Sequence, residues 1–204
     1  MSEGSKPWGT TAPPSTRTEM PESIGYVKFV GNVDGGTASA LMKAVDDYLA
    51  QGVSRIVLLM SSPGGTVFHG LTLYNYLAGL PIEVDTHNFG TVDSIGAALY
   101  VAGKRRYTVP DARFLIHGVS ANFPANTALE EGQLAERLAG LRSDTANIAS
   151  VLARGTGRTT EELHNVMLAR TVLTPAEAIA FGLAHEIKSD LFPSGARVTS
   201  IIKE

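Results

Sequence analysis

The sequence predicts an α/β fold in which helices cover a parallel sheet. Three observations carry this prediction. Strand-like and helix-like segments alternate from Ile24 onward, as in chains that build a parallel sheet from strand–helix–strand units. The run Ile56–Met60 is continuously apolar, which is typical of a strand buried on both faces. Two later segments open with Thr159 and Thr174, each followed three residues on by a glutamate, which is a helix-capping pattern.

Strands are predicted where β-branched and aromatic residues gather between turn residues. The first, Ile24–Val33, ends before Gly35-Gly36. The second predicted strand contains the apolar run Ile56–Met60. From the second onward, the predicted strands are Arg55–Met60, Ile82–Asn88, Arg106–Val109 and Arg113–His117, with a Pro110-Asp111 turn between the last two.

Helices are predicted where apolar residues recur at helical spacing. One long segment, around Gln133–Arg154, has more apolar positions than a simple crossover would bury, which favours a subunit contact. The two capped segments end the series. In chain order the helices lie around Leu41–Leu49, around Leu71–Leu77, at Ile95–Ala102, along the long segment, after Thr159, and from Thr174 to Gly182.

Composition limits the function classes. The chain has 204 residues, a net charge of −3 and a pI near 6.0, which suits one domain and gives no basic surface for nucleic acid. Cysteine is absent, which excludes disulfides and cysteine nucleophiles. No apolar run approaches the roughly 18 residues that span a bilayer. We expect a soluble, cytoplasmic protein that has no metal or other cofactor and binds neither nucleic acid nor membranes.

The chain divides by composition into three parts. Residues 1–22 are rich in proline, serine and threonine and poor in bulky apolar residues, so we expect a flexible tail. Residues 23–190 carry the alternating pattern and form the predicted domain. Residues 191–204 are left as a C-terminal extension.

Three stretches carry candidate chemistry. Ser61–Gly65 follows the apolar strand, and its glycines expose N–H groups to an oxyanion, although a plain strand-to-helix turn has the same pattern. Ser94 lies between a strand and a helix of small residues, as either a simple N-cap or a nucleophile on a sharp turn. His117 ends an apolar strand, as either a buried structural histidine or a general base.

Taken in order, these stretches resemble one family, the ClpP serine peptidases, which are the proteolytic subunits of ATP-dependent Clp protease. The resemblance covers roughly Ile24 to Ile187. Residues 61–65 resemble the family's Ser-Pro-Gly-Gly loop, 90–97 its Gly-x-x-x-Ser-Met-Gly-Ala turn with Ile95 in place of Met, 115–117 its Met-Ile-His strand, and 173–183 its Leu-Ser-x-x-Glu-Ala-x-x-Tyr-Gly-Leu helix.

The resemblance implies a fold and a mechanism. The fold would be the crotonase-like ββα superhelix, with a protruding handle at about 120–155 that joins two heptameric rings of a homo-oligomer. Ser94 would be the nucleophile, His117 the general base, and the N–H groups of Gly65 and Ile95 the oxyanion hole. The substrate would be a peptide or an unfolded protein, hydrolysed through an acyl-enzyme, and a AAA+ unfoldase would be a partner. No metal or other cofactor is implied.

The sequence also departs from the family pattern. Arg170 stands where the family carries the catalytic aspartate, and no carboxylate lies between Glu162 and Glu177. Because the acid of a catalytic triad orients the imidazole, its loss predicts weak activity. Three side chains could orient the imidazole instead: Asp93, Asn165 and Thr171. Asp93 has a second reading, as an acid that only caps the helix or lies at the surface. A water or a backbone carbonyl is a further alternative for orienting the imidazole.

Other departures put the partners in question. The family's axial-loop segment is not recognisable in residues 1–25, and Gly118-Val119 follows His117 where the family has Gln-Pro. Two further functions also stay open, the first of them because of Arg170. One is a catalytically weak or inactive ClpP-like subunit with a structural or regulatory role in a mixed ring. The other is an acyl-CoA enzyme of the crotonase fold, which would share a glycine-lined oxyanion hole.

Overall fold

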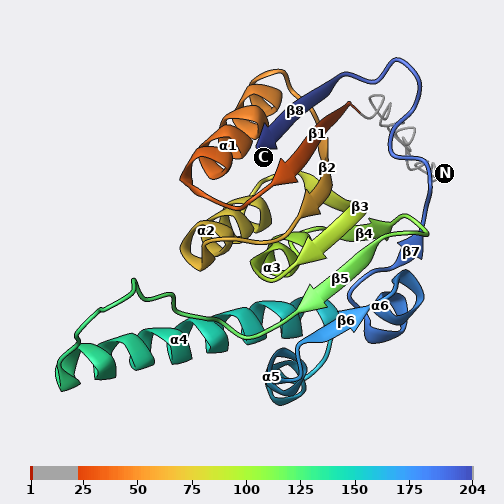
Figure 1. The fold of residues 1–204 in the computed structure, drawn as a ribbon. Coiled ribbons are helices and arrows are strands. Elements are labelled where there is room, and N and C mark those ends of the chain that lie inside the picture. Colours follow the sequence, from red (N-terminus) through yellow and green to blue (C-terminus); the bar gives the residue numbers. More distant parts are fainter. Residues whose placement is uncertain (2–22, 204) are drawn as a thin grey trace.

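The computed structural model describes Met1 and residues 23–203, and the predicted tail at 1–22 lies outside the described residues apart from Met1. The described part has a mixed α/β fold, with one sheet and six helices, so the α/β part of the predicted fold is confirmed (Figure 1). The strands are β1 (Ile24–Gly31), β2 (Arg55–Ser62), β3 (Glu83–Asp93), β4 (Arg105–Thr108), β5 (Arg113–Ile116), β6 (Thr171–Leu173), β7 (Glu186–Ile187) and β8 (Val198–Lys203).

The sheet runs in the order β6-β5-β3-β2-β1-β8, and β4 pairs with both β3 and β7. Its neighbours are parallel except for the antiparallel pair β5–β6. The long strand β3 forks the sheet, because Asp85–Asn88 pair with β4 whereas Thr91–Asp93 pair with β5. This fork carries the end of β3 to the end of β5, which brings Ser94 and His117 into one region.

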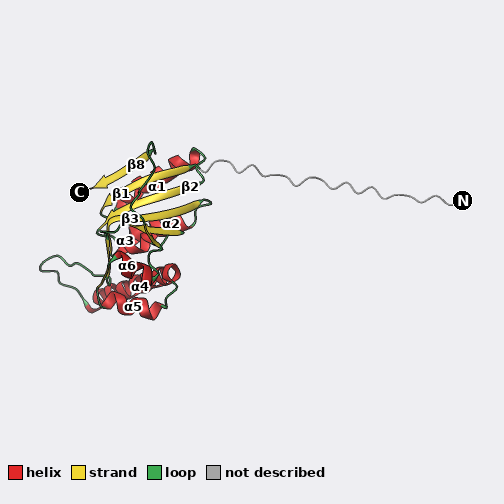
Figure 2. Cartoon of the chain, turned by 90° about the vertical axis from the view of Figure 1, so that its right-hand side faces the viewer, coloured by secondary structure: helices red, strands yellow, loops and turns green. Residues whose placement is uncertain are grey.

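Helices α1, α2 and α3 lie together on one face of the sheet (Figure 1), and Figure 2 shows them behind the strands with the later helices below. The main apolar core lies between these helices and the sheet. Both capping predictions hold, because Thr159 and Glu162, and likewise Thr174 and Glu177, form reciprocal capping boxes. The helices are α1 (Gly35–Ala50), α2 (Val67–Ala78), α3 (Ile95–Tyr100), α4 (Glu131–Thr156), α5 (Thr160–Leu168) and α6 (Pro175–Phe181).

The C-terminal segment belongs to the sheet. Residues 191–204 were set apart as an extension, yet β8 pairs in parallel with β1 along Tyr26–Gly31. The hydroxyl of Tyr48 lies 3.1 Å from the carbonyl oxygen of Tyr26 and 3.2 Å from that of Arg197, so α1 ties the two strands together. The segment leading to β8 also covers the second face of the sheet, where Leu191 packs with the buried pair Val57 and Leu59.

Helix α4 is the longest element, with 26 residues. Only its C-terminal half is buried, at Ile148–Leu152, and the rest projects away from the sheet (Figure 1). Leu134 and Leu138 on the projecting half are 51% and 47% exposed. No helix among the described residues is long and apolar enough to cross a membrane.

A buried arginine holds the helix ends to the sheet. The guanidinium of Arg106 on β4 donates to four backbone carbonyls, at distances of 2.7 to 3.2 Å. They belong to Gly103 after α3, Gly155 near the end of α4, and Gly182 and Leu183 after α6. Because four separate carbonyls share one donor group, the packing of α4 and α6 depends on this side chain.

Candidate active site

Ser94 occupies a strained turn between β3 and α3. Its φ of 58° and ψ of −129° lie outside the regions that L-residues ordinarily adopt. Such strain costs about 1–3 kcal/mol and gathers at functional sites. The Ser94 N–H donates to the carbonyl of Leu115 on β5 at 2.7 Å, which fixes the turn against the strand that leads to His117. Ser94 is the N-cap residue of α3, but its hydroxyl makes no capping hydrogen bond.

The glycine loop after β2 packs directly against this turn. A Cβ placed on Gly64 would lie 2.6 Å from the Cβ of Ser94 and 2.8 Å from the carbonyl oxygen of Asp93. Gly64 also has a φ of +94°, in the region that favours glycine. The carbonyl of Gly64 accepts a 2.7 Å hydrogen bond from the Val33 N–H, which anchors the loop to the chain after β1. Only glycine therefore permits this approach to Ser94.

Two backbone N–H groups flank the serine. Gly65 and Ile95 line the same cavity as Ser94, one from the glycine loop and one from the first turn of α3. Within the described residues neither N–H donates to a protein acceptor, whereas the N–H of Ser94 is taken by Leu115. Two such donors on either side of a serine can bind the oxyanion of an acyl-transfer reaction.

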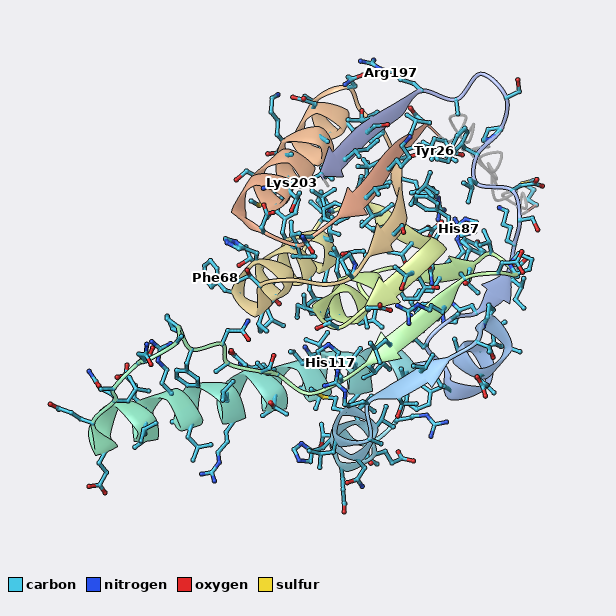
Figure 3. All side chains as sticks on the ribbon, viewed as in Figure 1. Tyr26, Phe68, His87, His117, Arg197 and Lys203 are labelled. Atoms are coloured by element: carbon cyan, nitrogen blue, oxygen red, sulfur yellow. The ribbon has the colours of Figure 1, made fainter. Side chains whose placement is uncertain are left out.

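His117 follows the last residue of β5 and is half-buried. Figure 3 shows it at the end of this strand, between α3 and α4. Its Nδ1 lies 2.7 Å from the carbonyl oxygen of Gly118. A carbonyl oxygen only accepts hydrogen bonds, so Nδ1 carries the proton and Nε2 keeps the lone pair that a general base needs.

Ser94 and His117 line one small cavity of about 60 Å³. Ser120 also lines it, and apolar side chains come from the first turn of α2, the first turn of α3, the chain after His117, and α4: Val67, Ile95, Val119, Ile148 and Leu152. No hydrogen bond joins the Ser94 hydroxyl to His117 in the described part of the chain. Hydrogen bonds between catalytic side chains are often long or poorly aligned before substrate binds. The missing hydrogen bond is therefore compatible with Ser94 as nucleophile and His117 as base.

The sequence model of the Clp protease family matches residues 26–190, which is more than half of the chain. The chain belongs to the Clp protease family. It is 33% identical over 136 residues to ATP-dependent Clp protease proteolytic subunit 2 of Chlamydia trachomatis serovar D and to that of Chlamydia muridarum. It is 32% identical over the same length to proteolytic subunit 1 of Chlamydia felis. These matches cover 66% of this chain and 65% of each relative's own length.

Arg170, which the family resemblance places at the position of an acid, lies beside a strand that pairs with β5 in this Clp protease family member. Strands β5 and β6 are antiparallel, with Ile116 opposite Thr171. Continuing this register by one residue sets His117 opposite Arg170. Arg170 is exposed and has a φ of 53°, and it directly precedes β6. The position where the family resemblance implies an aspartate thus lies next to the last pair of β5 and β6, and it holds an arginine.

The side chains considered as substitutes have other contacts. Asp93 is 5% exposed, and its carboxylate pairs with Arg113 at 2.8 Å and accepts the hydroxyl of Thr91 at 2.7 Å. The hydroxyl of Thr171 donates to the carbonyl of Val166 at 3.0 Å. Asn165 is exposed on α5. Among the described residues none of the three forms a hydrogen bond with His117. The backbone carbonyl of Gly118 does, and a backbone carbonyl was one of the alternatives that the sequence left open.

A second histidine, His87, lies on the opposite face of the sheet (Figure 3). Its Nε2 is 2.8 Å from the carbonyl oxygen of Lys188, and burial lowers the pKa of its imidazole. It lines a larger cavity of about 560 Å³ with Arg55, Asp85 and Phe192, away from Ser94.

No group of three or more acidic, histidine or cysteine side chains that could hold a metal occurs in residues 23–203.

Proposed function

We propose that this chain is a serine peptidase of the ClpP type that hydrolyses peptides or unfolded polypeptide through an acyl-enzyme on Ser94. One observation carries the proposal. The strained serine shares a cavity with a histidine whose Nδ1 is the protonated nitrogen, and two backbone N–H groups flank that serine. These are the three parts that acyl transfer needs: a nucleophile, a base and an oxyanion hole.

The chemistry follows from these positions. His117 Nε2 takes the proton of the Ser94 hydroxyl as its oxygen attacks the scissile carbonyl. The N–H groups of Gly65 and Ile95 stabilise the negative oxygen of the tetrahedral intermediate. The imidazolium then returns the proton to the leaving amine, and a water activated by the same nitrogen hydrolyses the ester.

The substitution Ser94→Ala tests this proposal. It should abolish peptide hydrolysis and labelling by a fluorophosphonate or β-lactone probe, while leaving the assembly state unchanged. Unchanged turnover in Ser94→Ala would refute the assignment. A CoA-binding assay separates it from an acyl-CoA enzyme of the crotonase fold, for which a serine–histidine pair at these positions has no role.

The assembly is also a proposal. The projecting half of α4, with its exposed leucines, and the chain before it would form the handle, at about 120–155, through which heptameric rings of this chain associate. The domain at 23–190 would follow the crotonase-like superhelix, act in the cytoplasm, and receive substrates from a AAA+ unfoldase. Light scattering that finds only a 21.5 kDa monomer at micromolar concentration would contradict the assembly.

A second function remains in view because of Arg170. A guanidinium opposite His117 opposes the positive charge that the imidazole gains during catalysis. A weak or inactive subunit with a structural role in a mixed ring would show no probe labelling of Ser94 in the homo-oligomer. Labelling at Ser94 would favour the peptidase.

A further inference from the structure

The imidazole of His117 donates its hydrogen bond to a backbone carbonyl and not to a side chain. Its Nδ1 lies 2.7 Å from the carbonyl oxygen of Gly118, the next residue along the chain. The same residue is held on its other side, because the Gly118 N–H donates to the carbonyl of Met167 at 3.0 Å. Met167 is 1% exposed and belongs to α5, so the core fixes the position of Gly118.

The acceptor is a main-chain atom, and packing does not require glycine here. A Cβ on Gly118 would approach only the carbonyl oxygen of Met167, at 3.9 Å. The relevant group is therefore the carbonyl and not the missing side chain. The buried carboxylate nearest in sequence to the nucleophile, that of Asp93, is already paired with Arg113.

We infer that the Gly118 carbonyl is the positioning group for His117 and acts in place of the carboxylate of a catalytic triad. This inference rests on the proposed function of Ser94 and His117. The carbonyl accepts from Nδ1–H and thereby leaves Nε2 as the base. A carbonyl cannot donate to Nδ1, so it does not favour the tautomer that carries its proton on Nε2. When an amide replaces the carboxylate of a catalytic triad, that tautomer forms and activity is lost. The Gly118 carbonyl carries no full charge, so it stabilises the imidazolium less than a carboxylate does.

A single-atom change tests this role. Replacing Val119 by its α-hydroxy analogue converts the 118–119 amide into an ester, whose carbonyl is a weaker acceptor, and leaves every side chain in place. A net hydrogen bond of this kind is worth a factor of roughly three to ten. We expect kcat for a fluorogenic peptide to fall by that factor with KM unchanged. The matched control is the lactic acid analogue at Ala128, an exposed residue outside the cavity of Ser94 and His117, which weakens the Thr127 carbonyl and should leave kcat unchanged.

A spectroscopic readout is independent of turnover. In the ¹⁵N solid-state spectrum of histidine-labelled protein, the His117→Gln variant identifies the His117 signals by difference. We expect Nδ1 to be the protonated, pyrrole-type nitrogen of the neutral ring and Nε2 the pyridine-type nitrogen. The opposite tautomer would overturn the inference. An unchanged kcat in the 118–119 ester, or an effect on KM alone, would also overturn it.

These results separate the inference from the function on which it rests. Turnover that depends on Ser94 but is insensitive to the ester would refute only the role of Gly118. No Ser94-dependent turnover in the unmodified protein would refute the proposed function, and the inferred role in catalysis with it.

Discussion

Arg170→Asp should raise the peptidase activity of this chain. Residue 170 and His117 each adjoin the last pair of β5 and β6, Ile116 and Thr171, so we expect a carboxylate at 170 to reach the imidazole. The backbone permits the change, because the φ of 53° at Arg170 is a conformation that aspartate adopts more readily than most residues. The new carboxylate would compete with the Gly118 carbonyl for the proton on Nδ1.

The size of the effect follows from the two acceptors. A hydrogen bond to a charged group contributes about 1.5–3 kcal/mol, and one to a neutral group about 0.5–1.5 kcal/mol. The difference, about 1.5 kcal/mol, corresponds to a rise in kcat of roughly tenfold. The assay is kcat for a fluorogenic peptide, measured beside Arg170→Asn, which removes the cation without adding a carboxylate. If Arg170→Asp is no faster than Arg170→Asn, then residue 170 does not reach the imidazole and the register argument fails.

Three more predictions concern the turn, the core and pH. Gly64→Ala should abolish probe labelling of Ser94, because the added Cβ would clash with the Ser94 side chain. The control Gly52→Ala, also at positive φ but with open space around it, should keep labelling. It should lower the free energy of unfolding in urea by only about 1 kcal/mol. Arg106→Met should lower the free energy of unfolding by about 3 kcal/mol or more, since it leaves buried carbonyls without their donor; a loss below 1 kcal/mol would contradict that reasoning. Burial lowers the pKa of His87, so the unfolded chain binds more protons below about pH 6.5, and stability should fall as pH drops through that value. His87→Asn should flatten this urea-unfolding profile, and an unaltered profile would exclude His87 as its source.

Local sequence patterns predict the helices and strands that bury apolar residues. They do not predict strands that form only by pairing with a strand far away in sequence. The capped helices α5 and α6 were found because a capping box is a short-range signal. Strand β8 was missed because only Ile201 on it is buried, which leaves no alternating pattern, and its partner β1 lies far away in sequence. The strand predicted at Ile82–Asn88 is too short, because β3 continues to Asp93. In the structure the chain there shifts register and continues as a strand.

The same distinction explains the site. That Ser94 and His117 line one cavity could be predicted, because both follow strand ends, where α/β proteins place reactive side chains. Asp93 was a reasonable candidate by proximity, but side chains alternate along a strand, so it shares a face with Thr91 and bonds to that hydroxyl and to Arg113. The group that does contact His117 is a backbone carbonyl, which the sequence left open as an alternative but could not assign to a residue, because every residue has one. The absence of a carboxylate near position 170 therefore predicts a weaker stabilisation of the imidazolium, and not the loss of the base.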